Sequence, residues 1–291
     1  MPLKPALKPL ALAAVPLLLA TTLGCSPKDD DVTASSGSSG AASCTPDKLP
    51  LKTKGQLTVA TDSPAYDPWF ADNKPSNGKG YESAVAYAVA KELGFDASQV
   101  KWVVEPFNNS YAPGDKKFDF DINQISITPQ RAQKVDFSDG YYTAAQAVIA
   151  LKKDHLQPGS LADLKGLKLG AQTGTTSLTV LRDDIKPTTQ PTVFVNTNVA
   201  KQALLNGQVD AIIADLPTAL YITAAEIPGS TVVGQFTQVS GEPEQFGMLM
   251  QKGSGLKTCL DQALAKVKSS GELAAIEKKW LSTNISVPVL K

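Results

Sequence analysis

An alternation of strand and helix patterns runs through the chain from Gly55 onward. The strand patterns are short runs rich in branched and aromatic residues, and segment 82–94 repeats apolar residues at helical spacing. The predicted strands lie at 56–61, 100–105, 118–126, 145–153, 167–172 and 209–215. Such alternation predicts α/β layers in which each sheet is mostly parallel and is flanked by helices.

The same pattern starts again near Leu151. The alternating region is longer than one sheet of this type needs, so we predict two similar lobes. Residues 51–143 and 240–291 are assigned to the first lobe, and residues 144–239 to the second. This arrangement implies a two-segment hinge, because the chain passes from one lobe to the other and then returns.

The composition is that of a globular protein, with 42% hydrophobic and 19% charged residues and a formal net charge of zero. A near-neutral chain without basic blocks lacks the electrostatic footprint of a nucleic-acid-binding protein. We therefore predict no nucleic-acid partner.

The N-terminus predicts export. Lys4 and Lys8 precede the apolar run "PLALAAVPLLLATTLGC", which has the length and the small-residue end of a signal peptide covering residues 1–24. Cys25 follows Thr22-Leu23-Gly24, which resembles a lipobox, although Thr22 replaces the usual leucine. We predict that Cys25 is lipidated and anchors the protein to the outer face of the cell membrane. The alternative is a plain secreted protein with an incidental cysteine.

Residues 25–50 are predicted to form a flexible tether, because the stretch "SPKDDDVTASSGSSGAAS" is poor in large apolar residues. Two cysteines remain besides Cys25, namely Cys44 and Cys259. In an exported protein, two cysteines besides the lipidated one predict a single disulfide. Here it would join the start of the folded body to a helix near its end.

Polar clusters follow four of the predicted strands. They are "TDSPAYDPWF" after the first strand, "SITPQR" after 118–126, "TGTT" after 167–172, and Asp215 at the end of 209–215. Ligands of α/β folds collect at the carboxyl ends of strands, so these clusters predict a binding cleft between the lobes.

At these clusters the chain resembles the amino-acid-binding solute-binding proteins (family 3) of ABC importers, as a lipoprotein of the actinobacterial type. The resemblance is carried by "VATDSPAYDPW", "SITPQRAQKVDFSDGYY", "SLADLKGLKLGAQTGTT", "ALLNGQVDAIIADLP" and "ALAKVKSSGELAAIEKKW", in this order. It implies a two-lobed periplasmic-binding-protein-like fold of type II, whose lobes close over a free amino acid.

The resemblance also implies roles for single residues. Arg131 matches the arginine that binds the substrate carboxylate, a role that suits the planar fork of a guanidinium. Ser126 matches a position that contacts the same carboxylate, and Thr175 and Thr176 offer further donors from the second lobe. Asp215 matches the aspartate that binds the substrate ammonium. Taken alone, Arg131 reads as a surface charge and Asp215 as a helix N-cap.

Six further residues complete the predicted site. The aromatic residues are expected to stack on the substrate side chain and exclude water, and the polar residues are expected to lie near its end. They are Tyr66, Trp69 and Phe107, with Asp62, Gln124 and Gln172. Gln124 departs from the family pattern, which has a small residue there, and the polar loop 108–117 replaces a short apolar helix.

We predict a monomeric binding protein, not an enzyme, that captures a free and polar amino acid and delivers it to an ABC permease. No catalytic residue, metal or cofactor is expected, because His155 is the single histidine and stands in the polar stretch "KKDHLQPG". Two alternatives stay open. One is an amino-acid-sensing receptor, and the other is a dehydratase-like enzyme on the same fold, with Asp62 and Asp215 as candidate acids.

Overall fold

The computed structural model describes residues 44–237, 243–281 and 286–291. These residues all fall in one unit of the chain, Ala41–Lys291, which we call the folded body. The predicted signal peptide, Cys25 and the tether as far as residue 43 lie outside the described residues. Among the helices that are described, none combines the length and the apolar character needed to cross a membrane.

The first lobe is built on a five-stranded sheet with the order β2-β1-β3-β10-β4. β1 pairs in parallel with β2 and β3, whereas β10 runs antiparallel to β3 and β4. The strands are β1 (Leu57–Thr61), β2 (Val100–Val104), β3 (Phe120–Asp121), β4 (Val135–Thr143) and β10 (Gln245–Gln251).

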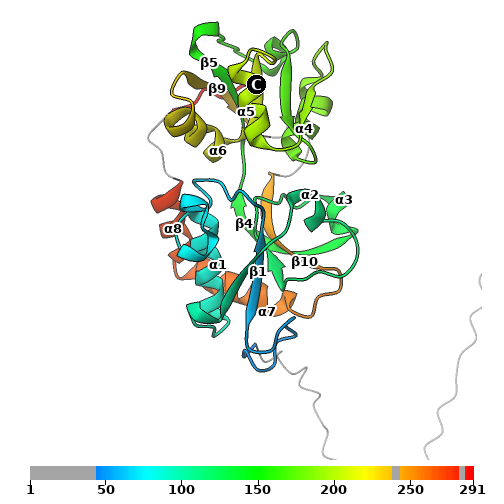
Figure 1. The fold of residues 1–291 in the computed structure, drawn as a ribbon, viewed down its shortest axis with the longest axis vertical. Helices are drawn as coiled ribbons and strands as arrows, with labels where there is room; N and C mark the ends of the chain where they lie inside the picture. Colours follow the sequence, from blue (N-terminus) through cyan, green and yellow to red (C-terminus); the bar gives the residue numbers. More distant parts are fainter. Residues whose placement is uncertain (1–43, 238–242, 282–285) are drawn as a thin grey trace, which may run out of the picture. The chain divides into compact units, whose positions relative to one another are not determined.

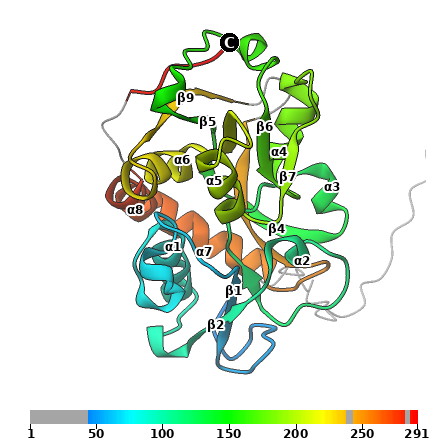
Figure 2. The same ribbon diagram turned by 45° about the horizontal axis from the view of Figure 1, so that its top comes forward.

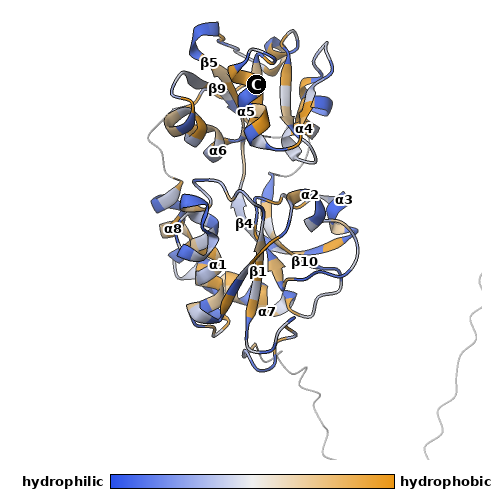
Figure 3. Ribbon diagram, in the orientation of Figure 1, coloured by the Kyte–Doolittle hydropathy of each residue, from blue (hydrophilic) through white to orange (hydrophobic). Residues whose placement is uncertain are grey.

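Helices cover both faces of this sheet. Figures 1 and 2 show α1, α7 and α8 gathered on one side, and the short helices α2 and α3 on another. Their bounds are Tyr81–Glu92, Lys257–Ser269, Glu272–Trp280, Phe107–Ser110 and Pro129–Ala132, respectively. The apolar residues of α1 and α7 form one buried core with the strands. Figure 3 shows hydrophobic residues along β10 and mostly hydrophilic residues in the connecting loops.

The second lobe repeats the plan with the strand order β7-β6-β8-β5-β9. β6 pairs in parallel with β7 and β8, and β5 runs antiparallel to β8 and β9. The strands are β5 (Gln146–Leu151), β6 (Leu169–Gln172), β7 (Thr192–Phe194), β8 (Ala211–Asp215) and β9 (Ser230–Phe236). The helices are α4 (Thr176–Val180), α5 (Thr197–Leu205) and α6 (Leu216–Tyr221).

Short helical turns complete the described structure. The 3-10 turns are Ala71–Asn73, Pro75–Asn77, Ala97–Gln99, Lys152–Asp154 and Leu161–Leu164, and the π-helical turns are Leu181–Ile185 and Ile222–Glu226. The two-lobed α/β architecture is the one that the sequence predicts. Each sheet is mixed, with four of its five strands running in one direction and the fifth, β10 or β5, running against them. A strand that enters a lobe from the hinge, such as β5 or β10, runs against the strands that lead towards the hinge.

The chain crosses between the lobes from β4 to β5 and again from β9 to β10. Residues 286–291, which the prediction places with the first lobe, pack on the second lobe instead. The backbone N–H of Gln235 donates to Pro288 O at 2.8 Å, and the N–H of Leu290 donates to Gln235 O at 2.8 Å. Leu290 is buried in the core of that lobe. Residues 286–291 therefore complete the second lobe, although the strands of that lobe all lie between Gln146 and Phe236.

A buried carboxylate fixes the turn that follows β3. Gln124 has a positive φ of 46°, a conformation that costs a residue with a side chain about 1 kcal/mol or more. Glu82 of α1 accepts the Gln124 backbone N–H at 2.6 Å, and it also accepts the Gln124 side-chain amide and the hydroxyl of Tyr141. These bonds hold Gln124 in the left-handed region, where the family pattern has a small residue.

Burial raises the pKa of Glu82 from 4.5 to about 7, against the opposing effect of the hydrogen bonds from Tyr141 and Gln124. The folded state therefore binds this proton more tightly than the unfolded state, so the stabilisation is complete below about pH 4.5 and is lost as the pH rises through about 7. We expect the loss to be about 3 kcal/mol of unfolding free energy.

Denaturant unfolding of the parent and of Glu82→Gln across this pH range measures the effect. The free-energy difference between the two proteins should change with pH, because only the parent titrates at this position. Glu92→Gln removes a carboxylate from the end of the same helix and serves as the control. Parallel pH curves for the parent and Glu82→Gln would contradict the assignment.

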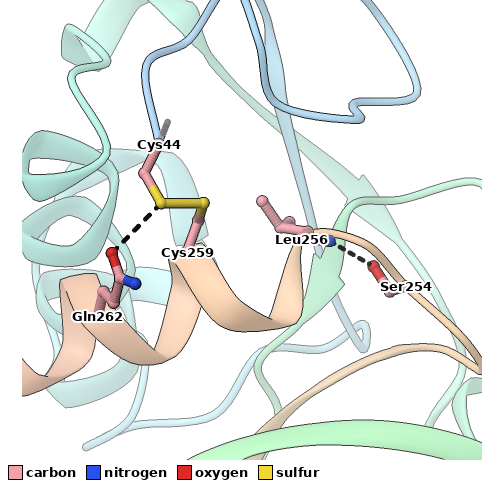
Figure 4. Close-up of a disulfide and its surroundings, with 5 residues drawn as sticks. All are labelled: Cys44, Ser254, Leu256, Cys259 and Gln262. Carbon is pink, nitrogen blue, oxygen red and sulfur yellow. Dashed lines mark hydrogen bonds between the residues drawn. A yellow bond between two sulfur atoms is a disulfide. The ribbon is translucent and has the colours of Figure 1, made fainter. Parts of the chain in front are cut away.

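A disulfide joins Cys44 to Cys259, the pair that the sequence predicts. Figure 4 shows the bond between the start of the described chain and the first turn of α7, with Oε1 of Gln262 3.4 Å from the Cys44 sulfur. The two cysteines are 215 residues apart in sequence. The bond thus ties the beginning of the folded body to a helix of the first lobe.

Replacing both residues (Cys44→Ser with Cys259→Ser) should lower the free energy of unfolding by about 2–4 kcal/mol, because the unfolded chain gains the freedom that the cross-link removes. Guanidinium unfolding of the double variant checks this value. Reduction should lower the unfolding free energy of the parent by the same amount, and it should leave the unfolding free energy of the double variant unchanged. Equal stability of the parent and the double variant would refute the expectation.

Candidate functional site

A cavity lies between the two lobes of the folded body, at the carboxyl ends of β1, β3, β6 and β8. Nine of the eleven residues predicted to bind substrate line it: Asp62, Tyr66, Phe107, Gln124, Ser126, Gln172, Thr175, Thr176 and Asp215. The two others, Trp69 and Arg131, are buried beside it. The six remaining lining residues are Asn123, Ser177, Thr197, Ile213, Ala214 and Thr218.

One carboxylate oxygen joins the lobes at this cavity. The hydroxyl of Ser126, from the first lobe, donates to Oε1 of Glu244 at 2.5 Å. The hydroxyl of Thr176, from the second lobe, donates to the same oxygen at 2.6 Å. The two hydroxyl oxygens lie 3.3 Å apart. Ser126 and Thr176 thus form a hydroxyl pair that can hold a carboxylate from both sides.

Gln146, the first residue of β5, connects this carboxylate to Asp215. Its side-chain N–H groups donate to Oδ1 of Asp215 at 2.8 Å and to Oε2 of Glu244 at 3.1 Å. Its side-chain oxygen, Oε1, accepts a hydrogen bond from the Ser177 hydroxyl at 2.6 Å, which fixes the orientation of the side-chain amide. One amide therefore bridges two carboxylates.

Asp215 is the last residue of β8 and precedes α6, but its side chain makes no capping hydrogen bond to that helix. Burial, and next the negative charge of Glu244, raise the pKa of Asp215 well above its ordinary value, while Gln146 and Arg131 act in the opposite direction. A carboxylate in such a place is stabilised in its charged form by a cation. Asp215 is therefore suited to binding an ammonium group.

Arg131 does not line the cavity, although its guanidinium bridges the lobes. Nη1 donates to the backbone oxygen of Ser126 at 2.7 Å, and Nη2 donates to that of Gly174 at 2.9 Å. The guanidinium carbon lies 4.7 Å from the ring centre of Tyr111 and 5.5 Å from that of Phe107. Burial lowers the pKa of Arg131, and the charges of Glu244 and Asp215 oppose that effect. Arg131 thus places a positive charge directly behind Ser126.

The three predicted aromatic residues fall into two groups. Tyr66 and Phe107 line the cavity. Trp69 is fully buried in the core of the first lobe, edge-on to Tyr142 with ring centres 5.4 Å apart. Its indole N–H donates to the hydroxyl of Thr218 on α6 at 2.8 Å, so Trp69 contacts the second lobe through a residue that lines the cavity.

Several polar side chains also line the cavity. Gln172 accepts from the hydroxyl of Thr197 at 2.9 Å, and Asp62 accepts from the backbone N–H of Ser63 at 2.7 Å. Burial raises the pKa of Asp62. The side-chain amide nitrogen of Asn123 is buried and has no hydrogen-bond partner. These side chains offer hydrogen-bonding groups to a ligand in the cavity.

Sequence reasoning missed several residues that the structure brings to the site. Ser177 is the residue after the motif "TGTT", and Thr218 is the residue after the motif "ALLNGQVDAIIADLP". Each motif would have included its site residue if it had been extended by one position. Gln146 begins β5 and Glu244 directly precedes β10, next to the two passages of the chain between the lobes, and no sequence motif marks either of them as a site residue. Only the tertiary structure brings these two residues together with Ser126.

Comparisons with known proteins agree with this geometry. A family model described as "Bacterial extracellular solute-binding proteins, family 3" matches residues 57–283. The L-cystine-binding protein TcyA of Bacillus subtilis is 31% identical over 242 residues, which are 81% of this chain and 85% of that protein. The glutamine-binding protein GlnH of the same organism is 31% identical over 221 residues, with 73% and 77% coverage. These relatives are binding proteins, not enzymes.

Among solved structures, an ancestral arginine-binding protein bound to glutamine matches with a TM-score of 0.66 and 33% identity. The match covers 79% of this chain and all of that one. The likeness confirms the predicted two-lobed fold of type II. Together with the family model, which spans most of the sequence, it shows that this chain belongs to family 3 of the bacterial extracellular solute-binding proteins.

Proposed function

We propose that the protein captures a free amino acid with a polar side chain in the cavity between its lobes and delivers it to an ABC permease. The observation that carries the proposal is the placement of a hydroxyl pair, Ser126 and Thr176, within one hydrogen-bonded network with Asp215. A free amino acid carries a carboxylate and an ammonium on adjacent atoms. It therefore needs donors and a carboxylate at neighbouring positions.

The carboxylate of the substrate is assigned to Ser126 and Thr176, with Arg131 behind them. A hydroxyl is an adaptable donor, and a buried guanidinium supplies the charge that makes an enclosed carboxylate tolerable. Because Nη1 of Arg131 binds the backbone oxygen of Ser126, its charge acts close to that hydroxyl. Thr175 supports the same region, since its hydroxyl donates to Gln172 O at 2.8 Å and accepts the Leu178 N–H at the start of α4.

The ammonium of the substrate is assigned to Asp215. This carboxylate lies at the cavity and is raised in pKa by burial, so a cation bound beside it gains the largest electrostatic benefit. The side chain of the substrate is assigned to the polar wall formed by Asp62, Asn123, Gln124 and Gln172. The named ligands of the relatives, cystine and glutamine, likewise carry polar groups.

Delivery to a permease and attachment through a lipidated Cys25 complete the proposal. Both follow from the resemblance and from the export signal in the sequence, and the family is described as extracellular. The part of the predicted tether that precedes the disulfide-bonded Cys44 would hold the folded body near the membrane and leave both lobes free to open and close.

A thermal-shift screen of the twenty amino acids and cystine tests the proposal. A ligand present at 100 times its dissociation constant should stabilise the protein by about 2.7 kcal/mol. We expect stabilisation by at least one polar amino acid, and an affinity at least roughly tenfold weaker for Asp215→Asn because the buried ammonium loses its charged partner. Asp210→Asn, at the opposite end of β8, is the control. No stabilisation by any free amino acid would reject the proposed function.

Closure of the lobes depends on Gly174, which lies where they approach each other. Gly174 has a φ of 74°, in the left-handed region. A Cβ atom at this position would collide with Oδ1 of Asn108 and with the hydroxyl of Tyr111, both from the first lobe. The backbone oxygen of Gly174 also accepts the Arg131 bridge. A residue with a side chain would adopt a strained backbone conformation here and would push aside the ends of Asn108 and Tyr111.

Replacing Gly174 by Ala should weaken amino-acid binding by roughly tenfold, because the strained backbone and the displaced Asn108 and Tyr111 side chains disfavour the contact between the lobes at the Arg131 bridge. Gly207→Ala, also at a positive φ but with open space around the added atom, provides the matched control. Titration calorimetry measures both variants. Parent-like affinity of Gly174→Ala would show that closure does not require this contact.

A further inference from the structure

The carboxylate of Glu244 occupies the donors that the proposed function assigns to the substrate. Its Oε1 accepts the hydroxyls of Ser126 and Thr176, and its Oε2 accepts the Gln146 amide at 3.1 Å. Glu244 is buried, with 6% of its surface exposed. It thus bridges the lobes from within the chain, in the way assigned to a bound amino acid.

The carboxylate of Glu244 and the carboxylate of a substrate cannot both accept hydrogen bonds from the Ser126 and Thr176 hydroxyls at the same time. A hydroxyl has one proton and can donate one strong hydrogen bond. Ser126 and Thr176 both donate to Glu244, so neither can donate to a second carboxylate at the same time. A substrate carboxylate that takes these hydroxyls must therefore displace Glu244.

Charge leads to the same conclusion. The guanidinium of Arg131 already interacts with the charges of two carboxylates, Glu244 and Asp215. A third buried carboxylate would be poorly compensated, whereas an exchange of one carboxylate for another leaves the charge beside Arg131 unchanged. The ammonium of the arriving amino acid then pairs with Asp215.

The fold permits such an exchange without moving the backbone. The backbone oxygen of Glu244 accepts the Ala144 N–H at 2.8 Å, and the next residue, Gln245, pairs with Thr143 in the sheet. These contacts hold the main chain at the start of β10. The exchange would therefore involve rotation about the side-chain bonds of Glu244 while its main chain stays in place.

We propose that Glu244 is an internal competitor, whose carboxylate must leave Ser126 and Thr176 before the carboxylate of an amino acid can bind them. This inference rests on the proposed function. The apparent affinity for an amino acid is then reduced by the fraction of molecules in which Glu244 holds the pair. Ligands that lack a carboxylate do not meet this competition, so Glu244 lowers the preference for the acid over its neutral amide.

Calorimetric titrations of the full chain with two pairs of probes test the proposal: L-glutamine with L-glutaminamide, and L-arginine with L-argininamide. The proteins are the parent, Glu244→Ala and Glu244→Gln, with Glu92→Ala as a control that removes a carboxylate outside the cavity. We expect Glu244→Ala to bind the free amino acid roughly tenfold more tightly or better, and Glu244→Gln to gain less, because its amide oxygen still accepts from the hydroxyls. The affinity for the amides should not change.

The outcomes separate the inference from the function on which it rests. If the parent binds an amino acid and neither variant binds it more tightly, the competitor role of Glu244 is overturned while the proposed function stands. A gain that is equal for the acid and its amide also overturns it, because competition requires a carboxylate. If none of these probes binds the parent or either variant, the inference fails, whereas the proposed function is rejected only if the screen of the twenty amino acids and cystine also finds no ligand. Binding that appears only in the variants supports the inference.

Discussion

Two hydroxyl groups that share one carboxylate oxygen hold the centre of this protein together. Ser126 comes from the first lobe and Thr176 from the second, and their oxygens lie 3.3 Å apart. Such a contact is strong because it is buried, where the effective dielectric constant is low. It is also conditional, because two neutral hydroxyls gain little from meeting without an acceptor between them. The closed arrangement of the lobes thus depends on which carboxylate is present.

The neighbouring groups extend this dependence. Gln146 links Glu244 to Asp215, and Arg131 ties the backbone of Ser126 to that of Gly174. A change in protonation or position at any of these groups therefore reaches the others through short contacts. Glu244, Asp215 and Arg131 therefore act as one electrostatic unit rather than as independent side chains. A zwitterion adds one charge of each sign to this unit.

Much of the architecture could be predicted from the sequence, because local patterns determine it. The alternation of elements and its restart indicated the two lobes. The polar clusters at strand ends, together with the resemblance to the solute-binding family, indicated nine residues of the cavity wall. Strand direction was less accessible, since the antiparallel courses of β5 and β10 follow from where the chain re-enters each lobe. Glu244 was missed because it lies 118 residues from Ser126 in sequence, and no local signal connects them. The backbone oxygens that accept hydrogen bonds from Arg131, and the positive φ of Gln124, likewise depend on tertiary contacts that no local pattern indicates.

The position of residues 286–291 has a consequence for how the chain is made. The second lobe is encoded in the middle of the sequence, yet Leu290 fills its core and Pro288 pairs with Gln235 of β9. Synthesis proceeds from the N-terminus, so that lobe still lacks part of its core after all of its own strands have been produced. Its final packing must wait until residues 286–291 have left the ribosome. Removal of residues 286–291 would therefore take core residues from the second lobe, whose strands end at Phe236, rather than from α7 and α8, which precede these residues in sequence.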